Sequence, residues 1–302
     1  MEPFFSIVIP TYNRCLMVQQ TIDSVLRQSF EAFEILVIDD GSTDNSFELL
    51  TGHYATNPKV SIIHQNNKER GAARNHGILK SKGKYVQFLD SDDILKRTHL
   101  ELLFKKIGEL NNPDFICSKY EFLRDGKVVA TDIQQLEEGY YDYKLFLNGN
   151  PIACNVCIRK DNKHLNLFEE DRNFAIKEDW MFLIQNLRHN KIYIIDEVSV
   201  TMNDHESRSM RSNNNIIIER TKKAENWILE KVDLSYSEKH SLKAHCNYFC
   251  GIHSYVDGKR KNGIMYTLKA ISLNGLKPKY VTLITKLIIG KDVIDSIKKL
   301  RR

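Results

Sequence analysis

The chain has 302 residues and a formal net charge of +5, and 42% of its residues are hydrophobic and 27% charged, which is typical of a soluble globular protein. It contains no run of about eighteen apolar residues, so a membrane-spanning helix is not expected. The N-terminal segment lacks the basic stretch and cleavage site of a signal peptide, which predicts a cytoplasmic protein.

Four short apolar runs, at residues 5–13, 33–40, 60–65 and 84–93, each end in turn residues and are predicted to be buried strands. Helical spacing predicts helices over 14–29, 41–50 and 71–82, with Ser42, Thr43 or Asp44 capping the second. Strands that alternate with helices indicate an α/β fold, with a mainly parallel sheet covered by helices on both faces.

The order loosens beyond residue 100. A helix is expected over 100–110, strands over 114–123 and 127–133 at a mixed edge of the sheet, and a further strand within 151–161. A helix over 177–190 and a strand over 191–200 follow. Beyond about residue 212 the pattern is helical, so we expect a domain of residues 1–212 and a helical C-terminal region of residues 213–302.

The C-terminal region is basic. Its last 26 residues hold eight lysines or arginines against Asp292 and Asp295. A short apolar stretch flanked by bases indicates an interfacial helix on an anionic membrane, although a solvated terminal helix fits equally well. The helices of this region could also cover an acceptor site or mediate self-association. Nucleic-acid binding is not expected, because no aromatic-rich RNA motif accompanies the charge.

The six cysteines are scattered, and in a cytoplasmic chain of this length we expect reduced thiols. Cys154 and Cys157 form a C-x-x-C pair, a spacing that also occurs in zinc sites. No second pair has finger-like spacing, because Cys246 and Cys250 are spaced for one helix face. The incomplete ligand set argues against zinc.

Three polar clusters follow predicted strands, at residues 10–13, 39–40 and 90–93. Because ligand sites of such sheets lie beyond the carboxyl ends of the strands, we expect the clusters to meet on one rim. In the third cluster, Asp92 with help from Asp90 is predicted to bind Mn²⁺ or Mg²⁺, which prefer oxygen ligands. Asp93 is predicted to cap the helix that follows.

Other polar residues have both a ligand-binding and a structural interpretation. Asp40 could accept a hydrogen bond from a base or ribose, or cap a helix. Arg70 and Arg74, among small residues that permit close approach, could bind phosphate or lie exposed on a helix. Two further segments leave the same choice open. Glu178 and Asp179 could supply a general base, or they could complement the dipole of the helix that they begin. His205 could bind a metal and Arg208 a diphosphate, or both could belong to a polar loop.

These segments, in this order, resemble the family 2 glycosyltransferases, inverting enzymes of the GT-A fold. The resemblance covers about residues 4–205 and rests on "SIVIPTYNR", "TIDSVLRQSF", "EILVIDDGSTD", "NKERGAARNHGI", "GKYVQFLDSDD" and "KEDWMFL". It implies a nucleotide-sugar donor, UDP-linked in the expected case, and a saccharide or lipid-linked acceptor at the inner membrane face.

The resemblance also implies residue roles. Pro10, Thr11 and Tyr12 would line the base pocket, and Asp40 would contact the base. Arg70 or Arg74 would contact the nucleotide, and Asp90 and Asp92 would form the D-x-D motif.

The resemblance implies three further roles. Asp179 would be the catalytic base, His205 a metal ligand and Arg208 a contact of the diphosphate. Two alternatives are a GT-A-like nucleotidyltransferase and a non-catalytic partner subunit.

Overall fold

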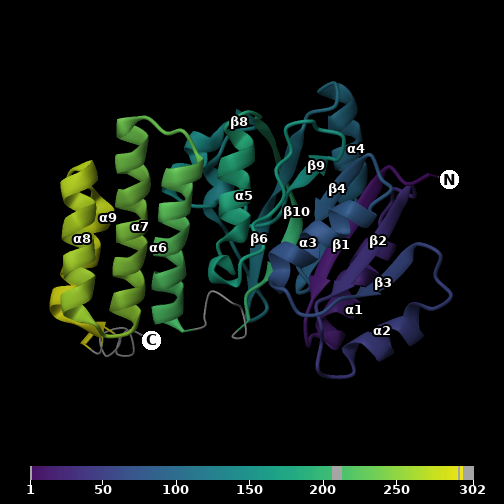
Figure 1. Ribbon diagram of the computed structural model, residues 1–302, viewed down its shortest axis with the longest axis horizontal. Helices are drawn as coiled ribbons and strands as arrows, with labels where there is room; N and C mark the ends of the chain where they lie inside the picture. Colours follow the sequence, from purple (N-terminus) through teal and green to yellow (C-terminus); the bar gives the residue numbers. More distant parts are fainter. Residues whose placement is uncertain (1, 206–212, 292, 295–302) are drawn as a thin grey trace. The chain divides into compact units, whose positions relative to one another are not determined.

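The computed structural model describes residues 2–205, 213–291 and 293–294. These residues form two compact units (Figure 1). The first comprises the described residues up to Tyr143 together with Asn150–His205. The second comprises Lys144–Gly149 together with the described residues from 213 onward.

In the first unit, the strands form one mixed sheet in the order β3-β2-β1-β4-β9-β6-β10-β5, with β7 paired to β6 and β8 paired to β10. The strands are β1 (Phe5–Thr11), β2 (Phe33–Asp39), β3 (Val60–His64), β4 (Tyr85–Phe88), β5 (Asp93–Leu95), β6 (Phe115–Arg124), β7 (Lys127–Val129), β8 (Gly139–Tyr141), β9 (Cys157–Arg159) and β10 (Ile192–Asn203). The helices are α1 (Cys15–Leu26), α2 (Ser46–Tyr54), α3 (Glu69–Lys80), α4 (His99–Glu109) and α5 (Glu178–Leu187), with 3-10 helices at Asp132–Gln135 and Arg172–Phe174. A further 3-10 helix, Tyr143–Asn148, belongs to the second unit except for its first residue.

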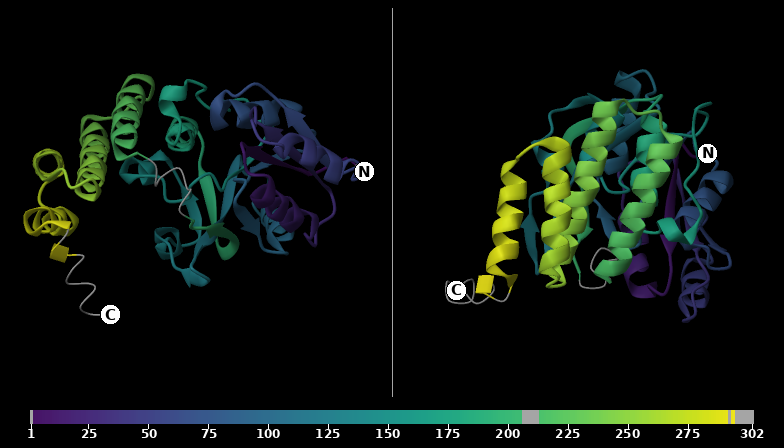
Figure 2. Two further views of the ribbon diagram at one scale, coloured as in Figure 1. Left: turned by 90° about the horizontal axis from the view of Figure 1, so that it is seen from below. Right: turned by 60° about the vertical axis from the view of Figure 1, so that its left-hand side comes forward.

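The parallel half of the sheet follows the predicted alternation of strands and helices. β1 pairs in parallel with both β2 and β4, and β2 with β3. Every residue of β1 is buried, as expected for a strand covered on both faces. Right-handed crossovers put α1 on one face of the sheet and α3 on the other, since the strand order reverses between them (Figure 2). The predicted α/β fold is confirmed.

The antiparallel strands differ from the expectation. β9 lies between β4 and β6 and is antiparallel to both. The segment expected at a mixed edge, β6, is therefore an interior strand, paired on its other side with β10. The edge strand on this side of the sheet, beyond β10, is β5, a short strand that the sequence pattern did not indicate.

One predicted helix cap is wrong and the other is partly right. Asp93 does not cap α4, whose N-cap is Thr98, because Asp93 instead begins β5 and pairs with β10 opposite Met202. Asn45 occupies the N-cap position of α2, but Asp44 of the predicted segment 42–44 accepts the backbone N–H of Ser46, the first residue of the helix, at 3.0 Å. Residues 42–44 form a turn in which the side chain of Asn13 accepts the backbone N–H groups of Thr43, at 2.8 Å, and Asp44.

The second unit consists mainly of helices: α6 (Asn214–Lys231), α7 (Tyr236–Val256), α8 (Arg260–Asn274) and α9 (Pro278–Ile289). A capping box formed by Ser235 and Glu238 begins α7. α7 packs against α6 and α8, and α9 packs against α8 and α7. The predicted helical pattern is confirmed here. No helix in the described ranges combines the length and the apolar character needed to span a bilayer.

Candidate active site

The three polar clusters meet because their strands are neighbours. At the end of β1, Thr11 pairs with Asp39 at the end of β2. On the other side of β1, the N–H of Leu89, just after β4, donates to the carbonyl of Val8 at 3.1 Å. The chain then turns into the acidic segment, so all three clusters lie along the carboxyl ends of adjacent parallel strands.

Asp40 and Thr11 offer polar atoms at this rim. One carboxylate oxygen of Asp40, Oδ1, accepts the side chain of Gln65 at 2.7 Å and the backbone N–H of Lys68 at 2.8 Å. The side-chain hydroxyl of Thr11 is buried and has no hydrogen-bond partner within the described part of the chain. A buried hydroxyl of this kind indicates a place for a ligand, because an unpaired polar group is costly. Pro10 is buried beside it and Tyr12 is exposed.

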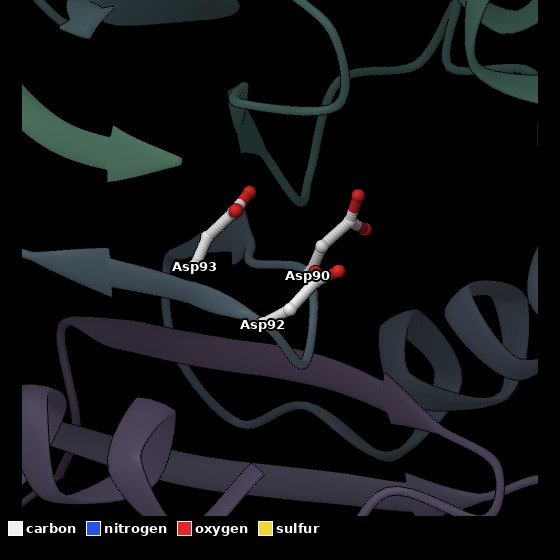
Figure 3. Close-up of side chains that lie close together, drawn as sticks. All are labelled: Asp90, Asp92 and Asp93. Atoms are coloured by element: carbon white, nitrogen blue, oxygen red, sulfur yellow. The ribbon is translucent and has the colours of Figure 1, made fainter. Parts of the chain in front are cut away.

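Asp90, Asp92 and Asp93 form a compact acidic cluster (Figure 3). One carboxylate oxygen from each lies within 4.8 Å of the others, and Asp92 and Asp93 are buried. Three oxygens at this spacing suit a hard divalent cation such as Mg²⁺ or Mn²⁺. Asp93, which the sequence assigned to a helix cap, is therefore a further candidate for the cation site.

Asp92 has two cationic or potentially cationic neighbours. Its Oδ2 atom lies 2.7 Å from Nε2 of His205 and 3.0 Å from Nη1 of Arg14. The side chain of Asn203 donates to its backbone carbonyl at 2.6 Å. The structure therefore places His205 next to Asp92, as a shared metal site would require. Arg208 lies outside the described residues.

Arg74 connects the acidic cluster to the acid pair at the start of α5. Nη2 of Arg74 lies 2.7 Å from Oδ1 of Asp90, and Nη1 lies 2.8 Å from Oε1 of Glu178. The Arg74 side chain is only 1% exposed and that of Glu178 only 3%. Arg70 is more open to solvent, and its Nε lies 3.7 Å from the same glutamate oxygen. Arg74 thus bridges two carboxylates that are far apart in the sequence.

Asp179 is half-buried next to this bridge. Its Oδ1 accepts the backbone N–H of Trp180 at 2.7 Å, and its Oδ2 accepts the side chain of Asn150 at 2.9 Å. Burial, reinforced by the negative charge of Glu178, raises the pKa of Asp179 to about 6, while Arg74 opposes the rise. A carboxylate with a pKa near 6 is suited to general-base work near neutral pH.

Sequence reasoning missed two site residues. Arg14 stands next to the first polar cluster in "TYNR", so its place at a strand end was the signal that could have found it. Asn150 lies in an irregular segment, and nothing in its local sequence distinguishes it from other loop asparagines. Cys154 and Cys157, considered above for zinc, are buried free thiols.

Comparison with known proteins agrees with this geometry. Residues 6–175 match the model of glycosyl transferase family 2, which is more than half of the chain. The chain belongs to this family.

Two curated relatives illustrate the similarity. An uncharacterized glycosyltransferase from Rickettsia felis is 35% identical over 199 residues, which cover 64% of this chain and 31% of that protein. The poly(ribitol-phosphate) beta-N-acetylglucosaminyltransferase TarP of Staphylococcus aureus is 32% identical over 219 residues, covering 69% of this chain and 66% of TarP. The chain thus spans about a third of the first relative and two thirds of the second.

A solved structure shows the same fold. Residues 1–349 of TarS from Staphylococcus aureus, in complex with UDP-GlcNAc, superpose with a TM-score of 0.67 at 19% sequence identity. The match covers 98% of this chain and 89% of the TarS chain. The GT-A fold expected from the sequence is therefore confirmed.

Replacing Arg74 by methionine should destabilise the protein by about 3–5 kcal/mol, because Glu178 would remain buried without its main ionic partner. Urea unfolding measures the loss. Glu178→Gln in the Arg74→Met background should recover part of it. Arg70→Met is the matched control and should change the free energy of unfolding by less than about 1 kcal/mol, because Arg70 is partly exposed. Equal losses in the two arginine variants would contradict the bridge.

Proposed function

We propose that this protein is a metal-dependent inverting glycosyltransferase. It transfers a sugar from a UDP-linked donor to a hydroxyl of a saccharide or lipid-linked acceptor. The observation that carries the proposal is the Arg74 bridge, which holds Asp90 of the acidic cluster and Glu178 of the acid pair on the same buried guanidinium. The bridge ties the acidic cluster, the proposed cation site, to the residue next to Asp179, the proposed general base. A displacement between a diphosphate and an alcohol requires such a cation site and base to be held near each other.

The donor side is assigned to the rim at the ends of β1, β2 and β4. We propose that Pro10, Thr11 and Tyr12 line the base pocket and that Asp40 binds the base through Oδ2, since Oδ1 is already used by Gln65 and Lys68. Arg70 and Arg208 are proposed to contact the donor phosphates. The sequence left open whether Arg70 or Arg74 contacts the nucleotide. Because the Arg74 guanidinium is already paired with Asp90 and Glu178, we assign it a positioning role.

A divalent cation fits the acidic cluster, with Asp92 and His205 as its proposed ligands and Asp90 assisting. When bound, Mn²⁺ or Mg²⁺ would offset the negative charge that develops on the leaving diphosphate. Before a cation binds, Arg14 and Arg74 reduce the repulsion among the carboxylates. Asp93, whose carboxylate belongs to the same cluster, is a further proposed ligand of the cation or of its water shell.

On the acceptor side, Asp179 is proposed to accept the proton of the attacking hydroxyl. The hydroxyl oxygen forms a bond to the anomeric carbon as the bond to the UDP oxygen breaks, and the proton passes to Asp179. This single in-line displacement inverts the configuration, so an α-linked donor gives a β-linked product. UDP-N-acetylglucosamine is the first donor to test, because the relative TarP is named for that sugar and TarS was solved with it.

The remaining assignments concern the whole chain. We propose that residues 1–212 form the catalytic domain and that residues 213–302 serve association with a membrane or with a second copy of the chain. The rival assignment is a non-catalytic partner subunit that binds a nucleotide sugar without turning it over. Family membership disfavours the other alternative, a nucleotidyltransferase.

Asp179→Asn should abolish transfer while leaving UDP binding within about twofold, because the amide cannot take a proton but keeps the shape of the site. The measurements are UDP release from UDP-sugars with Mn²⁺ and an acceptor, and calorimetric titration with UDP. Asp161→Asn is the control, because this carboxylate is exposed and pairs with Arg159 rather than with a residue of the site. If the wild-type protein binds UDP-sugars but never releases UDP, the partner-subunit assignment is correct instead. Wild-type turnover by Asp179→Asn would refute the base assignment.

The value of kcat/KM should fall at acidic pH with an apparent pKa near 6. Asp179 must be ionised to act as a base, and burial raises its pKa to about 6, so the active form is lost as the pH falls below that value. Each pH unit below 6 should then reduce the rate about tenfold. A pH–rate profile from pH 4.5 to 8 checks this. A rate that is flat down to pH 4.5 would contradict it.

A further inference from the structure

The second unit carries an unusual charge distribution in its last two described helices. Residues 258–291, which include all of α8 and α9, contain eight basic side chains and no acidic one. These are Lys259, Arg260, Lys261, Lys269, Lys277, Lys279, Lys286 and Lys291. A segment with this composition attracts anionic surfaces over roughly a Debye length.

Large apolar side chains lie exposed among these bases. On α8, Met265 and Leu268 are one turn apart, and Leu268 is 52% exposed. On α9, Val281 and Ile288 are two turns apart on one face, and Ile288 is 65% exposed. Single exposed leucines are ordinary, but apolar residues repeated at helical spacing on two adjacent helices form a surface suited to contact.

Both helices turn their other sides to α7. A β-carbon built on Gly251 of α7 would lie 2.9 Å from the hydroxyl of Thr267 in α8 and 3.2 Å from a methyl group of Leu283 in α9. Thr267 and Leu283 belong to the buried faces of α8 and α9. The exposed residues of the two helices therefore face away from α7. We call this surface the α8–α9 face and define it by Lys261, Met265, Leu268, Lys269, Val281 and Ile288, which are all exposed.

We propose that the α8–α9 face docks on an anionic lipid bilayer without crossing it. The aliphatic side chains would enter the boundary between headgroups and acyl chains, and the lysines would contact lipid phosphates. This inference rests on the proposed association of residues 213–302 with a membrane and names the surface and the lipid, and it needs no catalytic residue. It places the protein where lipid-linked acceptors are found.

Two other occupants fit the surface less well. A second copy of the chain would bring the same basic segment against itself, and like charges across an interface oppose association. A nucleic acid would suit the charge, but the exposed large apolar residues of α8 and α9 are all aliphatic, whereas single strands are bound by stacking on aromatic side chains. Aliphatic residues interspersed with bases match a lipid surface.

Flotation of the full-length protein with vesicles tests the proposal. Vesicles of phosphatidylcholine containing about a third phosphatidylglycerol should carry the protein upward, and vesicles of phosphatidylcholine alone should not. The double variant Lys261→Glu, Lys269→Glu and the triple variant Met265→Ser, Leu268→Ser, Ile288→Ser should each weaken binding at least about tenfold. The controls are Lys105→Glu and Leu79→Ser, which change an exposed base on α4 and an exposed leucine on α3.

Several results would overturn the proposal. One is equal flotation of the wild type and both surface variants, and another is binding that does not depend on anionic lipid. Loss of binding in the glutamate variant with full binding by the serine variant would indicate a purely electrostatic surface of the nucleic-acid type. A change in molar mass by light scattering without any change in flotation would indicate an interface between copies.

A second inference concerns Asn150, which lies in the segment before β9. Its Nδ2 atom donates to Oδ2 of Asp179 at 2.9 Å and to the carbonyl of Ala153 at 2.9 Å. Its Oδ1 accepts the backbone N–H of Ile152 at 3.2 Å. The orientation of the amide is fixed by its own loop, because the acceptor oxygen must face the N–H of Ile152. The loop turns at Ala153, whose backbone adopts the left-handed conformation with φ of +52°.

We propose that Asn150 is a positioning residue for the general base, an inference that rests on the proposed role of Asp179. The Trp180 N–H holds one carboxylate oxygen and the Asn150 amide holds the other, so the carboxylate cannot rotate about its own axis. A base held in this way meets the acceptor hydroxyl in one geometry. The Asn150 hydrogen bond also stabilises the ionised form, against burial and against the charge of Glu178.

Asn150→Ala should lower kcat about tenfold or more, leave the donor KM within about twofold, and shift the acid limb of kcat/KM to higher pH. The charged groups that face Asp179 are Glu178, Arg74 and Asp90, and Cys154 stays neutral because burial raises its pKa. These groups are unchanged in the variant, so the shift reports the lost hydrogen bond. Asn148→Ala, two residues earlier and exposed, is the control.

The two possible failures can be distinguished. If Asp179→Asn loses transfer while Asn150→Ala keeps the wild-type kcat and acid limb, Asn150 has no positioning role and the base assignment stands. If Asn150→Ala lowers kcat and the melting temperature together without moving the acid limb, its role is structural only. If Asp179→Asn keeps transfer, the base assignment itself is wrong.

Discussion

The site depends on one buried guanidinium. Arg74 lies between Asp90, which follows β4, and Glu178, which begins α5, and is almost fully removed from water. An unpaired charge at that depth would cost several kcal/mol, so neither partner can move away without a large penalty. A buried ion pair of this kind contributes little net stability. Its effect is to fix the spacing between the acidic cluster and the acid pair.

The small residues of α3 explain how Arg74 reaches this position. A β-carbon on Gly77 would lie 2.3 Å from a methyl group of Val8, and one on Gly71 would lie 2.5 Å from the carbonyl of Glu169. The helix therefore packs closely on β1 on one side and on the segment leading to α5 on the other. Asn75 strengthens the second contact by donating to the carbonyl of Phe168 at 2.9 Å. Close packing and the ion bridge thus act on the same segment.

Much of this site could be predicted from the sequence, because its main parts follow directly from strand ends. Parallel strands share an edge, so Thr11, Asp40 and Asp90 had to be neighbours once their strands were recognised. Asp93 and Asn150 could not be assigned in the same way. Asp93 looked like a helix cap because the pairing of β5 with β10 depends on residues more than a hundred positions away. Asn150 owes its place to a loop held by a residue with positive φ, which no periodicity reveals.

The electrostatics of the rim couple the binding of the donor to the binding of the cation. Three carboxylates lie within 4.8 Å of one another, and the described side chains that pair with them include Arg14 and Arg74. A diphosphate brought to this rim alone would meet these carboxylates at short range, and their repulsion would be strong where the dielectric is low. A divalent cation changes the sign of that interaction. Donor and cation affinities must therefore be linked, since the cation offsets the repulsion that opposes the diphosphate and the diphosphate adds negative charge that attracts the cation.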